Sequence, residues 1–221
     1  MTTLVTSVDW SFADHPQPPS PNLHGLVRNV LVAGLEGAVH TELTVTVIHP
    51  GGWLKPHFHS FEESLYILEG ELLMQLDGKV HRLRKGDFTL QPVGVWHALG
   101  NAGSEAVRML SVNTPQRLGP DAGRKDTFFA KGALDATALV ARAVRPRFGH
   151  PTVRYVGHYD GTPPQLEALA VTDPARGRKP IGMDIALLVY SGISVKMLVD
   201  RVFGADLLTV FTVDYEIGGA A

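Results

Sequence analysis

Histidine and glutamate side chains that can bind a metal ion gather in one short stretch of the chain. His57, His59 and Glu63 lie in this stretch, and His97 follows further along. Successive side chains of a β-strand alternate between its faces, so the rings of His57 and His59 project to one side, and Glu63 can join them across a short bend. Three imidazoles and one carboxylate suit a divalent Mn, Fe, Co, Ni, Cu or Zn ion, and they leave one or two positions for water or substrate.

Two alternatives to this ligand set remain open. Glu62 stands next to Glu63 in the chain, although the spacing from Glu63 to Gly70 favours Glu63. The four side chains also fit hydrogen-bonded core histidines and a surface glutamate, which is the ordinary interpretation of a single histidine. The other histidines have no spacing typical of ligands, and we predict that they are solvated or lie in turns: His15, His24, His40, His49, His81, His150 and His158.

Short β-strands are the elements expected to position these ligands. The 23 glycines and 15 prolines are spread along the chain, which favours many short elements joined by tight turns. Runs of apolar and β-branched residues predict strands at 42–49, 63–68 and 71–76, and Asp77-Gly78 is a typical hairpin-turn dipeptide. Short strands at this spacing indicate a sandwich or a barrel.

An alanine-rich stretch interrupts the strand pattern. Asp135 stands where it can cap a short helix over residues 136–144, and the proline-containing residues 145–151 end that helix. A second helical turn is expected to begin at Pro163-Pro164.

The motif positions from Gly51 to Gly70 and from Gly86 to Asn101 resemble the paired signature motifs of the cupin superfamily. Every defining position is filled at the usual spacing, and the resemblance covers about residues 25–115. It implies an all-β fold, an antiparallel cupin (jelly-roll) β-barrel. It also implies one divalent transition metal, bound by the two histidines, the glutamate and the later histidine of the motifs: His57, His59, Glu63 and His97.

A partial internal repeat suggests a second unit of the same kind. Aligning Gly192-Ile193 with Gly25-Leu26 also aligns Gly218-Gly219 with Gly51-Gly52. The repeat indicates a bicupin-like chain with an incomplete second cupin unit, in which residues 207–217 form one strand. Its unpaired strand edges must be covered by the first barrel or by a second chain, so a homodimer or other homo-oligomer is one expectation.

The predicted domain organisation follows from the motifs, the linker and the repeat. Residues 1–132 form the complete barrel with the metal site. Residues 133–151 form a linker with a short helix, and residues 152–221 begin a second cupin-like unit that is apparently truncated.

Composition and charge exclude several classes of protein. The chain has no cysteine, so disulfides, thiolate metal sites and cysteine nucleophiles are impossible. The net charge of −2 provides no basic field for nucleic acid or an anionic membrane. The chain starts with no basic stretch followed by an apolar one, and no apolar run is long enough to span a membrane. We therefore expect a cytoplasmic protein whose partner is a small-molecule substrate.

The surroundings of the metal are predicted from strand periodicity and from neighbours of the ligands. Lys55 and Arg108 are the only candidates considered for binding an anionic substrate group, and neither is well placed. The side chains expected to line a substrate pocket are Trp53, Phe61, Leu65, Met74, Gln91 and Trp96.

Three classes of function are compatible with these features. One is a metal-dependent dioxygenase. The second is a non-redox metalloenzyme, such as an aminohydrolase, decarboxylase, isomerase or cyclase. The third is a non-catalytic barrel that binds a small molecule, because a fold alone does not choose among activities. The apolar mouth and the lack of an evident anion-binding residue favour a dioxygenase-type oxidoreductase acting on an aromatic or enolic compound.

Overall fold

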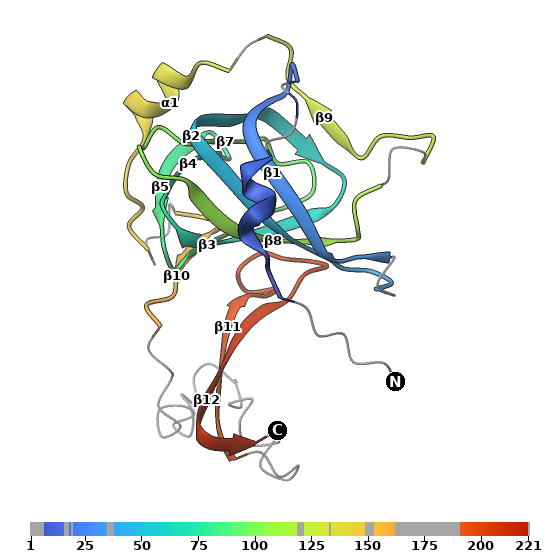
Figure 1. Ribbon diagram of the computed structural model, residues 1–221, viewed down its shortest axis with the longest axis vertical. Coiled ribbons are helices and arrows are strands. Elements are labelled where there is room, and N and C mark those ends of the chain that lie inside the picture. The colour runs from blue at the N-terminus through green and yellow to red at the C-terminus, as the bar shows by residue number, and fades with distance from the viewer. Residues whose placement is uncertain are drawn as a thin grey trace.

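One antiparallel β-sheet curls around a shared interior and forms most of the protein (Figure 1). The computed structural model describes residues 7–15, 18, 20–34, 38–118, 122–132, 134–148, 153–161 and 191–220. Within these residues the large sheet has ten strands, and β11 and β12 form a separate two-stranded sheet. The expected all-β barrel architecture is therefore confirmed.

The strands of the large sheet are short, apart from the second one. Their bounds are β1 Leu23–Val32, β2 Glu42–His59, β3 Glu62–Glu69, β4 Glu71–Leu76, β5 Lys79–Arg84, β6 Asp87–Gln91, β7 His97–Gly100, β8 Val107–Thr114, β9 Thr127–Phe129 and β10 Val156–His158. The remaining elements are the 3-10 helix Trp10–Asp14, α1 Ala136–Arg142, β11 Ser191–Val199 and β12 Val210–Ala220. Among the described residues, no helix combines the length and apolar character needed to cross a membrane.

The long strand β2 connects the parts of the sheet. It pairs with β1 and β8 along its first half, and with β7 and β9 nearer its end. A glycine is needed near the middle of β2, since a side chain at Gly52 would meet the backbone of Gly25 and His49 at under 3 Å. The histidines at the end of β2 thus lie next to two other strands.

The barrel interior is apolar over most of its length and polar near the ends of β2 and β8. Leucine, isoleucine, valine and methionine side chains from eight of the ten strands make the main core, including Leu26, Ile48, Leu65 and Ile67. Thr44, Thr46, Ser111 and Asn113 are buried on β2 and β8. Since burying polar groups costs free energy unless they find partners, this polar region is a candidate for a site.

The Asp77-Gly78 turn forms as predicted. Both residues have positive φ, 49° and 77°, which matches the two-residue turn that joins paired antiparallel strands. The turn lies close to one of the predicted ligands, His97. The Asp77 backbone N–H donates to the carbonyl of Trp96, and Leu76 pairs with His97.

Several described residues after the barrel strands pack on the outside of the large sheet. Asp135 caps α1 as predicted, by accepting a hydrogen bond from the Ala138 backbone N–H. The short strand β10, which the predicted boundary assigned to the second unit, pairs with β6 of the large sheet. A second apolar cluster joins β6 to the C-terminal residues and contains Phe88, Leu90, Tyr159, Leu198, Val199, Ala205 and Leu208.

The two-stranded sheet β11–β12 extends away from the curled sheet (Figure 1). The strand predicted over residues 207–217 is present from Val210 onward. The helical turn predicted at Pro163-Pro164 and the apolar run 185–190 lie outside the described residues. The described strands do not by themselves establish a second cupin unit, so the bicupin arrangement and its domain boundaries stay predictions.

Candidate metal centre

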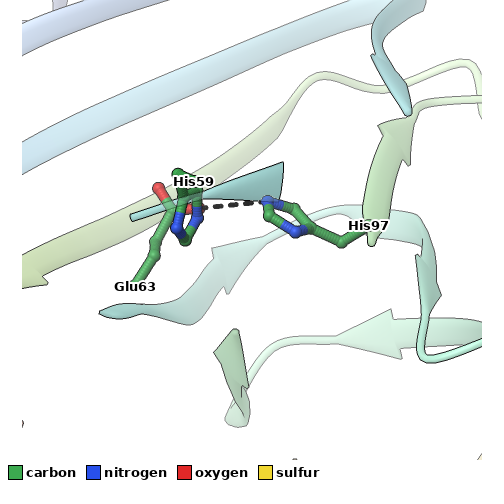
Figure 2. Close-up of side chains that lie close together, drawn as sticks. All are labelled: His59, Glu63 and His97. Carbon is green, nitrogen blue, oxygen red and sulfur yellow. Dashed lines mark ion pairs between the residues drawn. The ribbon is translucent and has the colours of Figure 1, made fainter. Parts of the chain in front are cut away.

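Two imidazoles and a carboxylate converge inside the barrel (Figure 2). His59, Glu63 and His97 are buried, and one ligand atom from each lies within 4.8 Å of the others. Glu63 Oε2 is 3.7 Å from His59 Nε2 and 3.8 Å from His97 Nε2. Two donor atoms that each bind one ion at about 2.1 Å are at most about 4.2 Å apart, so these separations suit a shared metal ion.

Strand pairing brings these side chains together from distant parts of the sequence. His57 and His59 end β2, Glu63 lies at the start of β3, and His97 begins β7 opposite His57. The His57 ring lies beside the group, with its centroid 4.1 Å from the His97 ring and 6.1 Å from the His59 ring. The His57 nitrogens are not among the ligand atoms that lie within 4.8 Å of one another. Among the described residues, that group consists of His59, Glu63 and His97.

Backbone carbonyls orient all three imidazoles. The Nδ1 atoms of His57, His59 and His97 lie 2.8, 2.6 and 2.9 Å from the carbonyl oxygens of Lys55, Phe61 and Val95. Because a carbonyl only accepts hydrogen bonds, each Nδ1 carries the hydrogen and donates it, and each Nε2 keeps its lone pair. This arrangement fixes the tautomer that a metal ligand requires.

The Nε2 atoms of His59 and His97 have no other partner. Both are buried and make no hydrogen bond within the described part of the chain. A buried polar atom without a partner is costly, and a bound cation would satisfy both lone pairs at once. The donor set and its unsatisfied atoms therefore fit a divalent metal ion.

Burial and mutual charge set the protonation of the site. Burial lowers the pKa of His57 to about 4 and the pKa of His97 to about 3, and neighbouring histidines add to the shift of His97. Burial alone would raise the pKa of Glu63, but His59, Arg28 and His97 outweigh it and hold this pKa well below its usual range. Near neutral pH, neutral His57 and His97 imidazoles thus face an ionised carboxylate, the forms that bind metal.

The adjacent glutamates Glu62 and Glu63 point to opposite faces of β3. Glu63 accepts a hydrogen bond from the Ser111 hydroxyl at 3.3 Å, on the side of the imidazoles. Glu62 accepts hydrogen bonds at 2.7–2.9 Å from the backbone N–H groups of Asp206, Leu207 and Leu208. Glu62 therefore holds the C-terminal segment against the barrel, and only Glu63 lies beside the histidines.

A cavity of about 380 Å³ opens onto the candidate ligands. It is lined by His57, His59 and Glu63, by apolar side chains, and by two arginines that the sequence analysis did not single out: Arg28 and Arg117. Arg28 follows the core residue Leu26 by two residues in β1. The two-residue period of a strand therefore predicts that Arg28 faces inward, and this pattern is the signal in the sequence for Arg28. No strand pattern in the sequence predicts that Arg117 reaches the cavity, because Arg117 lies beyond the end of β8.

Most of the predicted pocket residues lie elsewhere. Phe61 lines this cavity, and its ring stacks on His59 with centroids 3.9 Å apart. Leu65 and Met74 belong to the apolar core, and Gln91 is buried against Thr89 and Met74. Trp53 packs near His24, and Trp96 is 44% exposed with its ring against Phe58.

Two candidate cations lie outside the cavity, and the expectation for His81 is wrong. Arg108 pairs with Glu69 and lies over the Trp10 ring, so it is outside the cavity. Lys55 contributes its carbonyl to His57 and is not among the cavity-lining side chains. His81 is buried at 3% exposure rather than solvated, because β5 is covered there by the bridge to Val144.

Comparisons with known proteins give consistent results for residues of the barrel. Residues 44–113 match a family model described as a cupin domain. Protein SchB of Streptomyces halstedii is 33% identical over 111 residues, which cover 50% of this chain and 80% of SchB. The polyketide synthase CurC of Streptomyces cyaneus is 30% identical over 110 residues, or 49% of this chain and 71% of CurC. A gentisate 1,2-dioxygenase of Ralstonia sp is 26% identical over 60% of this chain and 39% of its own length.

Solved structures also resemble the barrel part of the chain. The polyketide cyclase RemF from Streptomyces resistomycificus is 23% identical with a TM-score of 0.45, and the match covers 54% of this chain and 90% of RemF. A cupin-like protein from Thermotoga maritima is 23% identical with a TM-score of 0.48, covering 57% of this chain and 91% of that protein.

Proposed function

Because this chain belongs to the cupin superfamily, we propose that it is a metal-dependent enzyme acting on a small organic molecule. The proposed ligands of one divalent transition metal are His57, His59, Glu63 and His97. The observation that carries the proposal is the pair of buried Nε2 atoms, on His59 and His97, that face the Glu63 carboxylate and have no other partner in the described residues.

The side chains around the ligands have supporting roles in this proposal. Ser111 holds one oxygen of Glu63, which leaves the other oxygen directed at the two histidines. Phe61 and Phe129 pack against the rings of His59 and His57 and limit access of water. A bound metal would supply Lewis-acid chemistry or the activation of water or O₂.

For the reaction itself we propose a dioxygenase-type oxidation. The likeness to a gentisate 1,2-dioxygenase and the aromatic walls of the cavity support this class. A non-redox reaction is the second candidate, and the likeness to CurC, which is named a polyketide synthase rather than an oxygenase, supports keeping it.

Two neighbouring glutamates provide a matched test of the metal site. In Glu63→Gln the carboxylate beside the histidines loses its charge, so we expect metal content after dialysis, measured by plasma mass spectrometry, to fall by about tenfold or more. Glu62→Gln makes the same change on the opposite face of β3, and this variant should keep the metal content of the unmodified protein. Equal metal content in both variants would contradict the proposed ligand set.

Oxygen uptake separates the two reaction classes. The iron-loaded protein is mixed with dihydroxybenzoates and with 1,3-diketones, and oxygen consumption is followed with an electrode. A dioxygenase consumes oxygen in step with loss of one of these compounds and stops under nitrogen. Loss of compound that continues at the same rate under nitrogen would replace the dioxygenase proposal by the non-redox one.

A further inference from the structure

Arg28 presents a positive charge to the cavity. It lies on β1 opposite Thr46 of β2, two residues from the core residue Leu26, so its side chain faces the barrel interior. It lines the cavity together with His57, His59 and Glu63. Within the described part of the chain it makes no hydrogen bond or ion pair. A guanidinium group stays charged in proteins and offers five N–H donors, so Arg28 offers a charged donor group to an anion that enters the cavity.

The second arginine of the cavity differs in this respect. Arg117 forms an ion pair with Glu42, and Glu42 also accepts a hydrogen bond from Asn113. The charge of Arg117 is therefore balanced by a side chain of the protein. The carboxylate of Glu63 is the other negative group that acts on Arg28, and in the proposed function it belongs to the metal. Arg28 is thus the cavity arginine without a carboxylate of its own.

Neighbouring polar atoms also lack partners. The hydroxyl groups of Thr44 and Thr46 are buried on β2 and form no hydrogen bond within the described residues. Thr46 is the cross-strand neighbour of Arg28. Neither threonine lines the cavity, so these hydroxyls show only that the barrel interior beside Arg28 contains polar atoms without a described partner.

The charges that line the cavity favour an anion once a metal is bound. The lining contains the carboxylates of Glu42, Glu63 and Asp126 and the guanidinium groups of Arg28 and Arg117. These groups carry one net negative charge when the histidines are neutral, and a divalent ion would change it to one net positive charge. A ligand with a single negative charge would restore neutrality, which lowers the cost of burying charge.

We propose that Arg28 binds a carboxylate group of the substrate, so that the substrate is a small, planar carboxylic acid. The guanidinium fork matches the two oxygens of a carboxylate, and the rings of Phe61 and Phe129 offer flat apolar walls for the remainder of the molecule. The part of this proposal that places the substrate next to a metal rests on the proposed function. The carboxylate site itself is formed by Arg28 and the cavity, and a bound metal would strengthen it by making the lining net positive.

Benzoate and benzamide test this inference, because they have nearly the same shape and differ in charge. Their dissociation constants are measured by titration calorimetry for the zinc-loaded and the metal-stripped protein. We expect benzoate to bind at least about tenfold more tightly than benzamide to the zinc-loaded protein, as expected for a charge-assisted hydrogen bond. In Arg28→Met this preference should disappear while the weaker affinity for benzamide stays unchanged. The control Arg108→Met removes an arginine outside the cavity and should leave the preference intact.

Several results would overturn the carboxylate site. These are equal affinities for the two probes in the unmodified protein, or a benzoate preference that survives in a folded Arg28→Met variant. If Arg28→Met does not fold, as judged by circular dichroism, Arg28→Lys replaces it. Lysine keeps the positive charge but lacks the two parallel N–H donors of the guanidinium group, so benzoate affinity should fall several-fold. An unchanged affinity would reject the inference. A benzoate preference that depends on Arg28 in a protein that binds no zinc would refute the proposed metal enzyme and leave the carboxylate site standing.

Discussion

Single residues decide which side chains can act at this site. Glu62 and Glu63 are chemically identical neighbours, yet one accepts three backbone N–H groups of the C-terminal segment and the other faces two imidazoles. The difference arises because successive side chains of a strand alternate between faces. Glu62 therefore binds the C-terminal segment, and Glu63 faces the two imidazoles.

Buried histidines should make the metal-free protein sensitive to acid. The pKa values of His57 and His97, about 4 and about 3, lie below the value of about 6.5 for an unfolded chain. Between pH 6.5 and 4 the unfolded chain binds more protons at these residues than the folded protein, so stability falls as the pH falls. We expect a loss of about 2 to 3 kcal/mol between pH 7 and 5.5.

Urea unfolding of the metal-stripped protein at several pH values measures this loss. The double variant His57→Gln/His97→Gln is the control, since it lacks both groups and should show a much flatter pH dependence. A free energy of unfolding that is constant from pH 7 to 5.5 in the metal-stripped protein would contradict the assignment of neutral buried imidazoles.

Individual elements bring the proposed ligands into register. The β4–β5 hairpin is one of them, because β4 pairs with β7 at its edge and Leu76 stands opposite His97. The turn that ends β4 thus lies beside the strand that carries a proposed ligand. Its geometry depends on two consecutive residues with positive φ.

Replacing Gly78 tests the contribution of this turn to stability. A side chain at Gly78 would meet nothing within 4 Å, so its cost comes from the backbone alone, which has a φ of 77°. We expect Gly78→Val to lower the free energy of unfolding by about 1 to 2 kcal/mol, with metal content unchanged because the position is exposed.

Thermal unfolding and metal analysis check this prediction together. Asp77→Asn is the matched control, because asparagine tolerates positive φ and should leave the melting temperature nearly unchanged. Loss of metal from Gly78→Val without a change in stability would mean that the turn positions His97 rather than stabilising the sheet.

At the scale of the whole molecule, Asp87 joins segments that are far apart in the sequence. Its fully buried carboxylate accepts hydrogen bonds from the Arg84 backbone N–H, from the guanidinium group of Arg145 and from the ring of His158. Arg145 follows α1, and His158 ends β10. One side chain of β6 therefore connects the barrel to both of these later segments.

Removing this charge should destabilise the folded chain. In Asp87→Asn, Arg145 and His158 lose their ionised partner, and we expect a loss of about 2 to 4 kcal/mol, discounted because Arg145 is partly exposed. Glu69→Gln, which breaks the exposed pair with Arg108, should cost less than about 1 kcal/mol. Guanidinium unfolding compares the two variants, and equal effects would show that Asp87 does not connect these segments in solution.

The sequence by itself determined the features that depend on local spacing. The alternation of His57 and His59, the Asp77-Gly78 turn and the cap at Asp135 all follow from interactions between residues close in the chain. The motif spacing also indicated the cupin barrel, because each glycine or histidine has a set place in a strand or a turn. These predictions needed no knowledge of which strands pair.

Only the tertiary structure decided what surrounds the candidate ligands. Arg28 reaches the cavity because β1 pairs with β2, and Arg117 reaches it because β8 places Glu42 and Asn113 side by side. Lys55 lies two residues before His57 in the sequence and Arg108 lies on β8, but neither side chain lines the cavity. Strand order and register depend on pairings between distant residues, which local spacing does not encode.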